Sequence, residues 1–263
     1  MPQIKVVVHG AAGRVGQEVV KAVCQEPEMK LVGAVDVKVT GDSLTLPDGS
    51  GKVPFSTDLK SILTTCQPDV VVDFTIAKAS MPAVRAAAEK GVNMVIGTTG
   101  FSADELAEME KLAASRKIGI VAAPNFALGA VLMIHLAKIA GKFIDHAEII
   151  ELHHDKKLDA PSGTSLLTAR AMAESRGKPF LPPSAGEHTP SRGQSLEGVN
   201  IHSVRMPGLM AHQEVIFGTS GQTLSIRHDT INRECYMPGV ILAVKAVVKQ
   251  KGFIYGLDKL LGL

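Results

Sequence analysis

The residues best suited to chemistry lie in one short stretch, from Glu151 to Thr164, which reads ELHHDKKLDAPSGT. It follows an apolar run typical of the end of a strand, and Pro161 disfavours helix in the residue before it. Ser162 or Thr164 is a suitable N-cap for the helical pattern that comes next. The free N–H groups at such a helix start, together with the helix dipole, bind anions. The stretch therefore has the groups needed to bind and protonate a small acidic substrate.

His153 and Lys157 are the candidate catalytic residues of this stretch. Histidine is the side chain that most readily exchanges protons near neutral pH, and the lysine supplies a positive charge. Charged loops are most often solvated segments without chemistry. This loop directly follows a buried-type strand and directly precedes an anion-binding helix start, which favours a functional site.

The stretch closely resembles the signature E-x-H-H-x-x-K-x-D-A-P-S-G-T of the dihydrodipicolinate reductase family, with no departure at the defining positions. The resemblance implies NAD(P)H-dependent reduction of 4-hydroxy-tetrahydrodipicolinate to tetrahydrodipicolinate, with loss of water, in the diaminopimelate route of lysine biosynthesis. It implies that His153 is the acid–base residue and that Lys157 donates a second proton or stabilises charge. It also implies that the carboxylates of the substrate ring are held by His154, Gly163 and Thr164.

The elements that must position this stretch begin with a dinucleotide-binding pattern at the N-terminus. A β-branched strand at 4–8 leads into Gly10, Gly13 and Gly16, and then into a helix. Glycines at a strand exit permit a tight turn and let the backbone approach a pyrophosphate at the helix N-terminus. Asp36 ends the next apolar strand, about 20 residues on, where a carboxylate holds the adenosine ribose. The family has the same G-x-x-G-R-x-G pattern.

The alternation of strand and helix continues along the chain. Apolar strands are predicted at 69–75, 92–96 and 118–122, and each ends in or is followed by polar residues or a Pro-Asn turn. Ligands of such sheets bind at the carboxyl ends of the strands. From this placement and from the family resemblance, we expect the cofactor to be bound by Gly10, Ala11, Ala12, Gly13, Arg14, Val15, Asp36, Gly97, Thr98, Thr99, Ala123, Pro124, Asn125 and Phe126.

The residues after Asp36 indicate which cofactor is preferred. Many members of the family have an arginine at the position of Val37, where it grips the 2′-phosphate of NADPH. A carboxylate instead accepts hydrogen bonds from the ribose hydroxyls of NADH and repels that phosphate. Lys38 lacks the bidentate fork of arginine, so its compensation is partial. We expect both NADH and NADPH to be used, with NADH modestly favoured.

The order of elements predicts an α/β protein of two domains. Residues 1–126 with 237–263 are expected to form a dinucleotide-binding domain with a Rossmann-like, doubly wound parallel sheet. Residues 127–236 are expected to form an α+β domain with a mixed sheet, which binds substrate and mediates oligomerisation.

Three strand-like segments support the second domain, near residues 199–205, 213–218 and 222–228. Two segments rich in Gly, Ser and Pro, 39–55 and 178–197, are predicted to be loops. The family resemblance further implies a homotetramer assembled through the sheet of this domain.

Composition argues against several other classes of protein. The 263 residues carry a formal net charge of +2, include no tryptophan and are 4% aromatic, so we expect no nucleic-acid partner. Three widely spaced cysteines fit reduced thiols and indicate neither a disulfide framework nor a metal site. The N-terminus lacks the form of a signal peptide, and Pro124, Asn125 and Gly129 interrupt the longest apolar stretch. We therefore expect a cytoplasmic protein without a membrane partner.

Two alternative functions are open at this point. One is another two-domain NAD(P)-dependent dehydrogenase of a small amino-acid-derived substrate. If it were of the acylating semialdehyde kind it would need a cysteine nucleophile, but neither Cys24 nor Cys66 follows a strand, and no histidine pairing is indicated for Cys235. The other is an NADH-sensing binding protein, which has no need for His153 and Lys157 beside an anion site.

Overall fold

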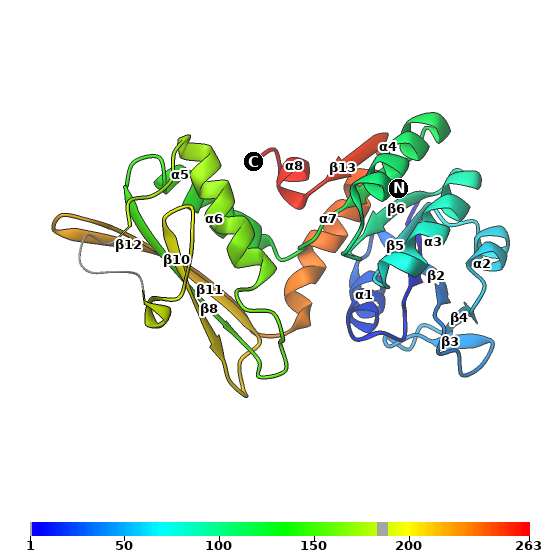
Figure 1. Cartoon of the computed structure of the whole chain (residues 1–263). Coiled ribbons are helices and arrows are strands. Elements are labelled where there is room, and N and C mark those ends of the chain that lie inside the picture. The colour runs from blue at the N-terminus through cyan, green and yellow to red at the C-terminus, as the bar shows by residue number, and fades with distance from the viewer. Residues whose placement is uncertain (1, 183–188) are drawn as a thin grey trace. The chain divides into compact units, whose positions relative to one another are not determined.

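The computed structural model describes residues 2–182 and 189–263, and its helices and strands are labelled in Figure 1. The chain divides into two compact units. Unit 1 comprises Met1–Leu128 and Arg233–Leu263, and unit 2 comprises Gly129–Asn232. The boundaries predicted at 126/127 and 236/237 differ slightly from these, and the roles assigned to the two predicted domains stay predictions.

Unit 1 is built on an eight-stranded sheet in the order β13-β7-β6-β5-β1-β2-β4-β3. Its strands are β1 (Ile4–His9), β2 (Met29–Val35), β3 (Ser43–Thr45), β4 (Lys52–Ser56), β5 (Val70–Asp73), β6 (Asn93–Ile96), β7 (Gly119–Ala122) and β13 (Gly252–Tyr255). All neighbours are parallel except β3, which runs antiparallel to β4. Because β1 lies between β5 and β2, the strand order reverses there. The predicted doubly wound sheet is confirmed. Its switch point lies at the carboxyl end of β1, which is where sheets of this type generally bind ligands.

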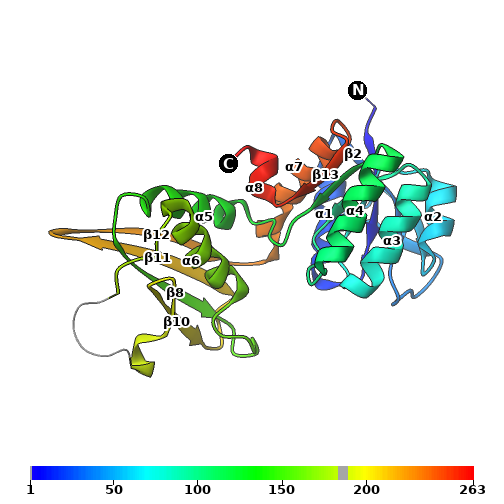
Figure 2. The same ribbon diagram turned by 45° about the horizontal axis from the view of Figure 1, so that its top comes forward.

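Helices cover both faces of this sheet. They are α1 (Arg14–Gln25), α2 (Leu59–Cys66), α3 (Ala77–Glu89), α4 (Ala103–Arg116), α7 (Met237–Val247) and α8 (Leu257–Leu261), with a 3-10 turn, η2, at Arg233–Tyr236. Helices α2, α3 and α4 lie side by side in Figure 2, whereas α1 packs against α7. Strands β5, β6 and β7 are buried at every position, as a parallel sheet covered on both faces requires.

One prediction for unit 1 is wrong, and one strand of this unit was not predicted. Residues 39–55, predicted to be a loop, contain β3 and most of β4. Strand β4 buries Val53 and Phe55, but the glycines, aspartates and prolines around it conceal this alternation in the sequence. Strand β13 is absent from the prediction because its four residues become recognisable as a strand only through their pairing with β7.

Unit 2 contains a five-stranded sheet in the order β12-β11-β8-β10-β9. Its strands are β8 (His146–His153), β9 (Gln194–Leu196), β10 (Val199–Arg205), β11 (Ala211–Thr219) and β12 (Gln222–Thr230). Strand β10 is parallel to β8, and the other pairs are antiparallel, so the predicted mixed sheet is confirmed. The central position of β8 brings its last residues beside the ends of both β10 and β11.

Helices α5 (Leu128–Ala140) and α6 (Gly163–Arg176) cover one face of this sheet (Figure 1). Their core includes Ala137 from α5, Met172 from α6 and Ile149 from β8, all with no measurable exposure. Of the predicted loop at 178–197, residues 183–188 lie outside the described residues, and the rest includes a 3-10 turn, η1 (Pro190–Arg192), and β9. Across both units, no described helix is long and apolar enough to cross a membrane.

Candidate active site

The loop between β1 and α1 is shaped by glycines that no other residue can replace. Gly10 has a φ of +86°, and a Cβ atom added to it would lie 2.6 Å from the carbonyl oxygen of Phe74. A Cβ added to Gly16 would lie 1.9 Å from the carbonyl oxygen of Gly10. Helix α1 begins after Gly13, and within the described residues no side chain caps its first turn. Its N–H groups therefore suit a pyrophosphate.

Asp36 ties this loop to the neighbouring strand. Its Oδ2 atom accepts a hydrogen bond from the N–H of Ala12 at 2.9 Å, and its Oδ1 atom accepts one from the N–H of Lys38 at 2.9 Å. Each carboxylate oxygen has a second lone pair, so the group can still accept from ribose hydroxyls. Val37, the next residue, is 87% exposed and is not part of the core.

A second carboxylate, Asp73 at the end of β5, organises the strand ends from within and is fully buried. Its Oδ1 atom accepts hydrogen bonds from the hydroxyls of Thr98 and Thr75, both at 2.8 Å, and from the N–H of Thr75 at 2.9 Å. Its Oδ2 atom lies 3.1 Å from Nδ1 of His9. Burial acts to raise the pKa of Asp73, but the bonds from His9, Thr98 and Thr75 outweigh burial and lower it.

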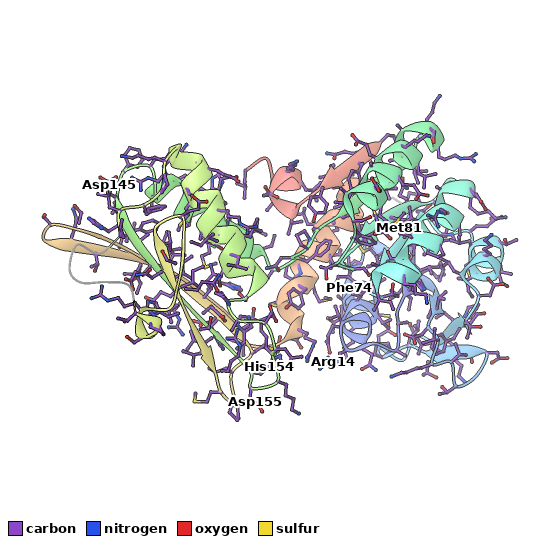
Figure 3. The ribbon with its side chains drawn as sticks, viewed as in Figure 1. Arg14, Phe74, Met81, Asp145, His154 and Asp155 are labelled. Atoms are coloured by element: carbon purple, nitrogen blue, oxygen red, sulfur yellow. The ribbon has the colours of Figure 1, made fainter. Side chains whose placement is uncertain are left out.

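The cofactor residues predicted from the sequence follow four strands of one sheet. Gly10–Val15 follow β1, Asp36 follows β2, Gly97–Thr99 follow β6, and Ala123–Phe126 follow β7. Arg14, labelled in Figure 3, is exposed at the start of α1, whereas Ala11, Thr98, Ala123 and Phe126 are buried. The hydroxyl of Thr98 is directed to Asp73, so its side chain positions the strand ends.

The ring of Phe74 connects two of these segments. Its centroid lies 5.7 Å from that of Phe126, and a Cβ added to Gly97 would lie 2.1 Å from its edge. Gly97 is thus required because the ring occupies the space of a side chain.

In unit 2, three residues meet at the ends of β8 and β10. Nδ1 of His153 is hydrogen-bonded to Oε2 of Glu151. Both guanidinium NH groups of Arg205 donate to the same carboxylate, NH1 to Oε2 at 2.9 Å and NH2 to Oε1 at 2.7 Å. Arg205 is brought there by the parallel pairing of β10 with β8, which places it opposite His153. Glu151 is fully buried, while the side chain of His153 retains 14% exposure.

The charge state of Glu151 is set by these neighbours. Burial alone raises the pKa of its carboxyl, but hydrogen bonds from His153, Arg205 and Ser203 outweigh burial and lower the pKa to about 2. Glu151 is therefore ionised near neutral pH. Glu151 and Arg205 are not among the site residues predicted from the sequence, although Glu151 opens the family signature.

The loop after β8 holds the other predicted residues of the signature. His154, labelled in Figure 3, is exposed, and its carbonyl oxygen accepts a hydrogen bond from the N–H of Lys157 at 3.1 Å. The ammonium of Lys157 lies 2.8 Å from both carboxylate oxygens of Asp159. This ion pair lowers the pKa of Asp159, chiefly through the hydrogen bond from Lys157. The ammonium of Lys157 is thus held by a carboxylate of its own loop.

Helix α6 begins where this loop ends. Ser162 is its N-cap and accepts a hydrogen bond from the N–H of Ser165 at 3.2 Å. A Cβ added to Gly163 would meet no atom within 4 Å, so the space beside the first turn is open. The N–H of Ser162 donates to Oε1 of Glu151 at 3.2 Å. The imidazole of His153 and the first turn of α6 are therefore joined by one carboxylate.

Comparison with known proteins identifies the family. The models for the N-terminus and the C-terminus of dihydrodipicolinate reductase match residues 4–126 and 129–261. The chain belongs to the dihydrodipicolinate reductase family. Its resemblance to that family, predicted from the Glu151–Thr164 signature, is confirmed.

Relatives cover the whole chain. A 4-hydroxy-tetrahydrodipicolinate reductase of Dehalococcoides mccartyi is 61% identical over 263 residues, which is 100% of both chains. One from Moorella thermoacetica is 48% identical over 98% of both chains. The dipicolinate-bound dihydrodipicolinate reductase from Paenisporosarcina sp. TG-14 has a TM-score of 0.86 and 41% identity, covering 98% of this chain and 99% of that one. An amine dehydrogenase from Mycobacterium smegmatis, at 16% identity and a TM-score of 0.67, shares the fold alone.

Membership of the dihydrodipicolinate reductase family makes the chain an oxidoreductase that uses a nicotinamide cofactor. It excludes the alternative of an NADH-sensing binding protein and that of another class of dehydrogenase. The roles of individual site residues stay predictions. Asp73 and His9 are not among the predicted site residues. The valine run before Asp73 is the one sequence signal that this carboxylate is buried, and it does not reveal the pairing with His9.

We predict that Asp73→Asn lowers the free energy of unfolding at pH 7 by about 1.5–3 kcal/mol, because it removes a buried charged acceptor. The pKa of Asp73 is lower in the folded than in the unfolded chain. Its stabilisation therefore exists above the unfolded pKa and is lost as the pH falls through the folded pKa. Urea unfolding should show the gap between wild type and variant narrowing below about pH 4.

Asp69→Asn is the matched control for this prediction. Asp69 is exposed just before β5, and its carboxylate accepts a hydrogen bond from the N–H of Lys5. We expect a change within about 0.5 kcal/mol for this variant. Equal stabilities of Asp73→Asn and wild type at pH 7 would contradict the role assigned to the buried carboxylate.

Proposed function

We propose that this protein reduces 4-hydroxy-tetrahydrodipicolinate to tetrahydrodipicolinate in the diaminopimelate route of lysine biosynthesis. The reaction consumes one NADH or NADPH and one proton, and it yields the oxidised cofactor and one water. The relatives named for this activity support the proposal. The observation that carries it is His153, held by the buried carboxylate of Glu151 next to the open first turn of α6.

The residues of unit 1 fit a nicotinamide dinucleotide. The N–H groups at the start of α1 would hold the pyrophosphate, and Asp36 would hold the adenosine ribose. Residues 97–99 and 123–126, at the neighbouring strand ends, would bind the nicotinamide end. When bound, the cofactor supplies a hydride to the substrate ring.

The residues of unit 2 fit a small dicarboxylate. We assign Gly163 and Thr164 to one ring carboxylate, since the first-turn N–H groups of α6 face open space. We assign His154 and Lys157 to the negative charge of the substrate, because both lie in the loop that leads into this helix. The Paenisporosarcina enzyme, described as dipicolinate-bound, supports a dicarboxylate as ligand.

The proton required by the reaction is assigned to His153. Its Nδ1 atom is hydrogen-bonded to Glu151, so Nε2 is the atom that can give a proton to the substrate ring. Lys157, whose ammonium is paired with the half-exposed Asp159, serves as a second proton donor or stabilises charge on the ring.

We predict that His153→Ala and Lys157→Ala each lower turnover by about 100- to 10,000-fold, as the loss of a general acid does. NADH affinity should change little, because the cofactor residues belong to unit 1. Steady-state oxidation of NADH with the condensation product of pyruvate and aspartate semialdehyde measures turnover, and fluorescence titration measures NADH binding. The neighbouring exposed lysine provides the control, Lys156→Ala, which should keep wild-type turnover. Wild-type turnover in both site variants would show that His153 and Lys157 are not the catalytic residues.

Both NADH and NADPH are expected to serve, with NADH modestly favoured. Val37 offers no cationic group to a 2′-phosphate, and the carboxylate of Asp36 repels it. The measurement is the ratio of kcat/KM for the two cofactors, with Lys38→Ala as the test of the lysine's contribution. A strong preference for NADPH in the wild-type protein would show that Asp36 and Val37 are misassigned. An unchanged ratio in Lys38→Ala would remove only the role of the lysine.

We also propose a cytoplasmic homotetramer assembled through the sheet of unit 2. Strand β12 is an edge of that sheet, and its residues 222–225 are exposed, including Leu224 at 44%. An exposed edge strand is able to pair with another chain. Light scattering at micromolar concentration should give four times the chain mass, and a monomeric mass would disprove the assembly. Cell fractionation should recover the protein with the cytoplasm.

A further inference from the structure

We propose that Glu151 is a positioning residue that fixes the tautomer of His153 and the first turn of α6 at the same time, with Arg205 as its counter-ion. This inference rests on the proposed function, because it concerns the same dicarboxylate site. Through its two oxygens, the carboxylate of Glu151 couples proton transfer at His153 to anion binding at the start of α6.

Both carboxylate oxygens of Glu151 accept hydrogen bonds. Oε2 receives Nδ1 of His153 and NH1 of Arg205, and Oε1 receives NH2 of Arg205 and the N–H of Ser162. The side chain of Ser203 is a further donor to this carboxylate. An ionised carboxylate offers about four acceptor positions, so none of them lacks a partner. A buried carboxylate satisfied in this way has no freedom to rotate, and it holds each donor in one place.

The tautomer of His153 follows from the charge of Glu151. A carboxylate that is ionised accepts hydrogen bonds and donates none, so the ring nitrogen facing it carries the hydrogen. Neutral His153 is therefore the Nδ1–H form, and its Nε2 is left to take up and release the catalytic proton. The small exposed part of this side chain, 14%, is consistent with a ring held on one side and open on the other.

The same carboxylate reaches the anion site. Its Oε1 atom binds the N–H of Ser162, and the hydroxyl of Ser162 caps the first turn of α6 through Ser165. Arg205 extends this hydrogen-bond network to the loop after β8, because its NH2 group also donates to the carbonyl oxygen of Asp159 at 2.7 Å. Asp159 is the ion-pair partner of Lys157. Loss of the Glu151 carboxylate is therefore expected to affect the imidazole of His153, the first turn of α6 and the loop that carries Lys157.

A purely structural ion pair is the competing explanation, since breaking any buried pair destabilises a protein. The two explanations differ in the protonation pattern of His153, which a structural pair has no reason to control. Strand β8 also provides a matched comparison. Glu148, on the same strand, accepts a hydrogen bond from Nε2 of His202 at 2.8 Å and one from the side-chain amide of Asn200, whereas Glu151 bonds to His153 and Ser162 of the signature.

The first experiment records two-bond ¹H–¹⁵N correlation spectra of histidine-labelled wild-type protein near pH 8, where an unperturbed imidazole is neutral. The His153 resonance is assigned by its loss in His153→Gln. We expect the Nδ1–H tautomer in the wild type, and its replacement by the Nε2–H form or a mixture in Glu151→Gln. An Nε2–H tautomer in the wild-type protein overturns the proposal, and this result needs no Glu151 variant to fold.

The second experiment measures function in folded variants. Glu151→Gln should lower kcat by about 10- to 100-fold, as loss of a group that orients a functional histidine does, and should weaken the binding of dipicolinate. Arg205→Lys, which keeps the charge but loses the bidentate geometry, should give a smaller loss of both. Glu148→Gln should leave kcat, dipicolinate binding and the His153 tautomer unchanged. Wild-type kcat in folded Glu151→Gln would overturn the proposal.

These outcomes separate the two levels of inference. A wild-type protein without reductase activity would remove the proposed function, whereas the tautomer of His153 would still be decided by the spectra. Normal reductase activity with the wrong tautomer would leave the proposed function in place and remove the role of Glu151.

Discussion

A carboxylate shut off from water must be matched by hydrogen-bond donors on every side, and this requirement shapes both units. Asp73 accepts hydrogen bonds at the ends of three neighbouring strands, β1, β5 and β6, from the last residue of β1 and from threonines two positions beyond the ends of β5 and β6. Glu151 collects them from two strands and the start of a helix. In each unit the charge brings together backbone segments that are distant in the sequence, and the groups proposed to bind ligands lie on those segments.

The two sheets suit different tasks. The parallel sheet of unit 1 is covered on both faces, so its binding groups are confined to loops at the carboxyl ends of strands. The mixed sheet of unit 2 has helices on one face, and the strand β8 passes through its centre. Because β8 ends directly in the signature loop, its rigid pairing holds the first residues of that loop.

Much of the fold and part of the site were accessible from the sequence, for physical reasons that can be named. The glycine spacing and the apolar strand runs are local patterns, and they led to the parallel sheet. The partners of the buried carboxylates are not local: Arg205 lies 54 positions from Glu151, and His9 lies 64 positions from Asp73. Their meeting depends on strand register, as in the parallel pairing of β10 with β8, which no short motif encodes. Short strands such as β13 were missed for the same reason.

The double hydrogen bond between Arg205 and Glu151 has an evolutionary consequence. A single substitution that removes the charge at either position leaves the other charge without its counter-ion in the interior, whereas a joint replacement by apolar residues removes both charges at once. The fitness effects of mutations at the two positions are therefore expected to be strongly epistatic. Loss of this pair during evolution would therefore pass through an intermediate that carries one buried charge without its counter-ion.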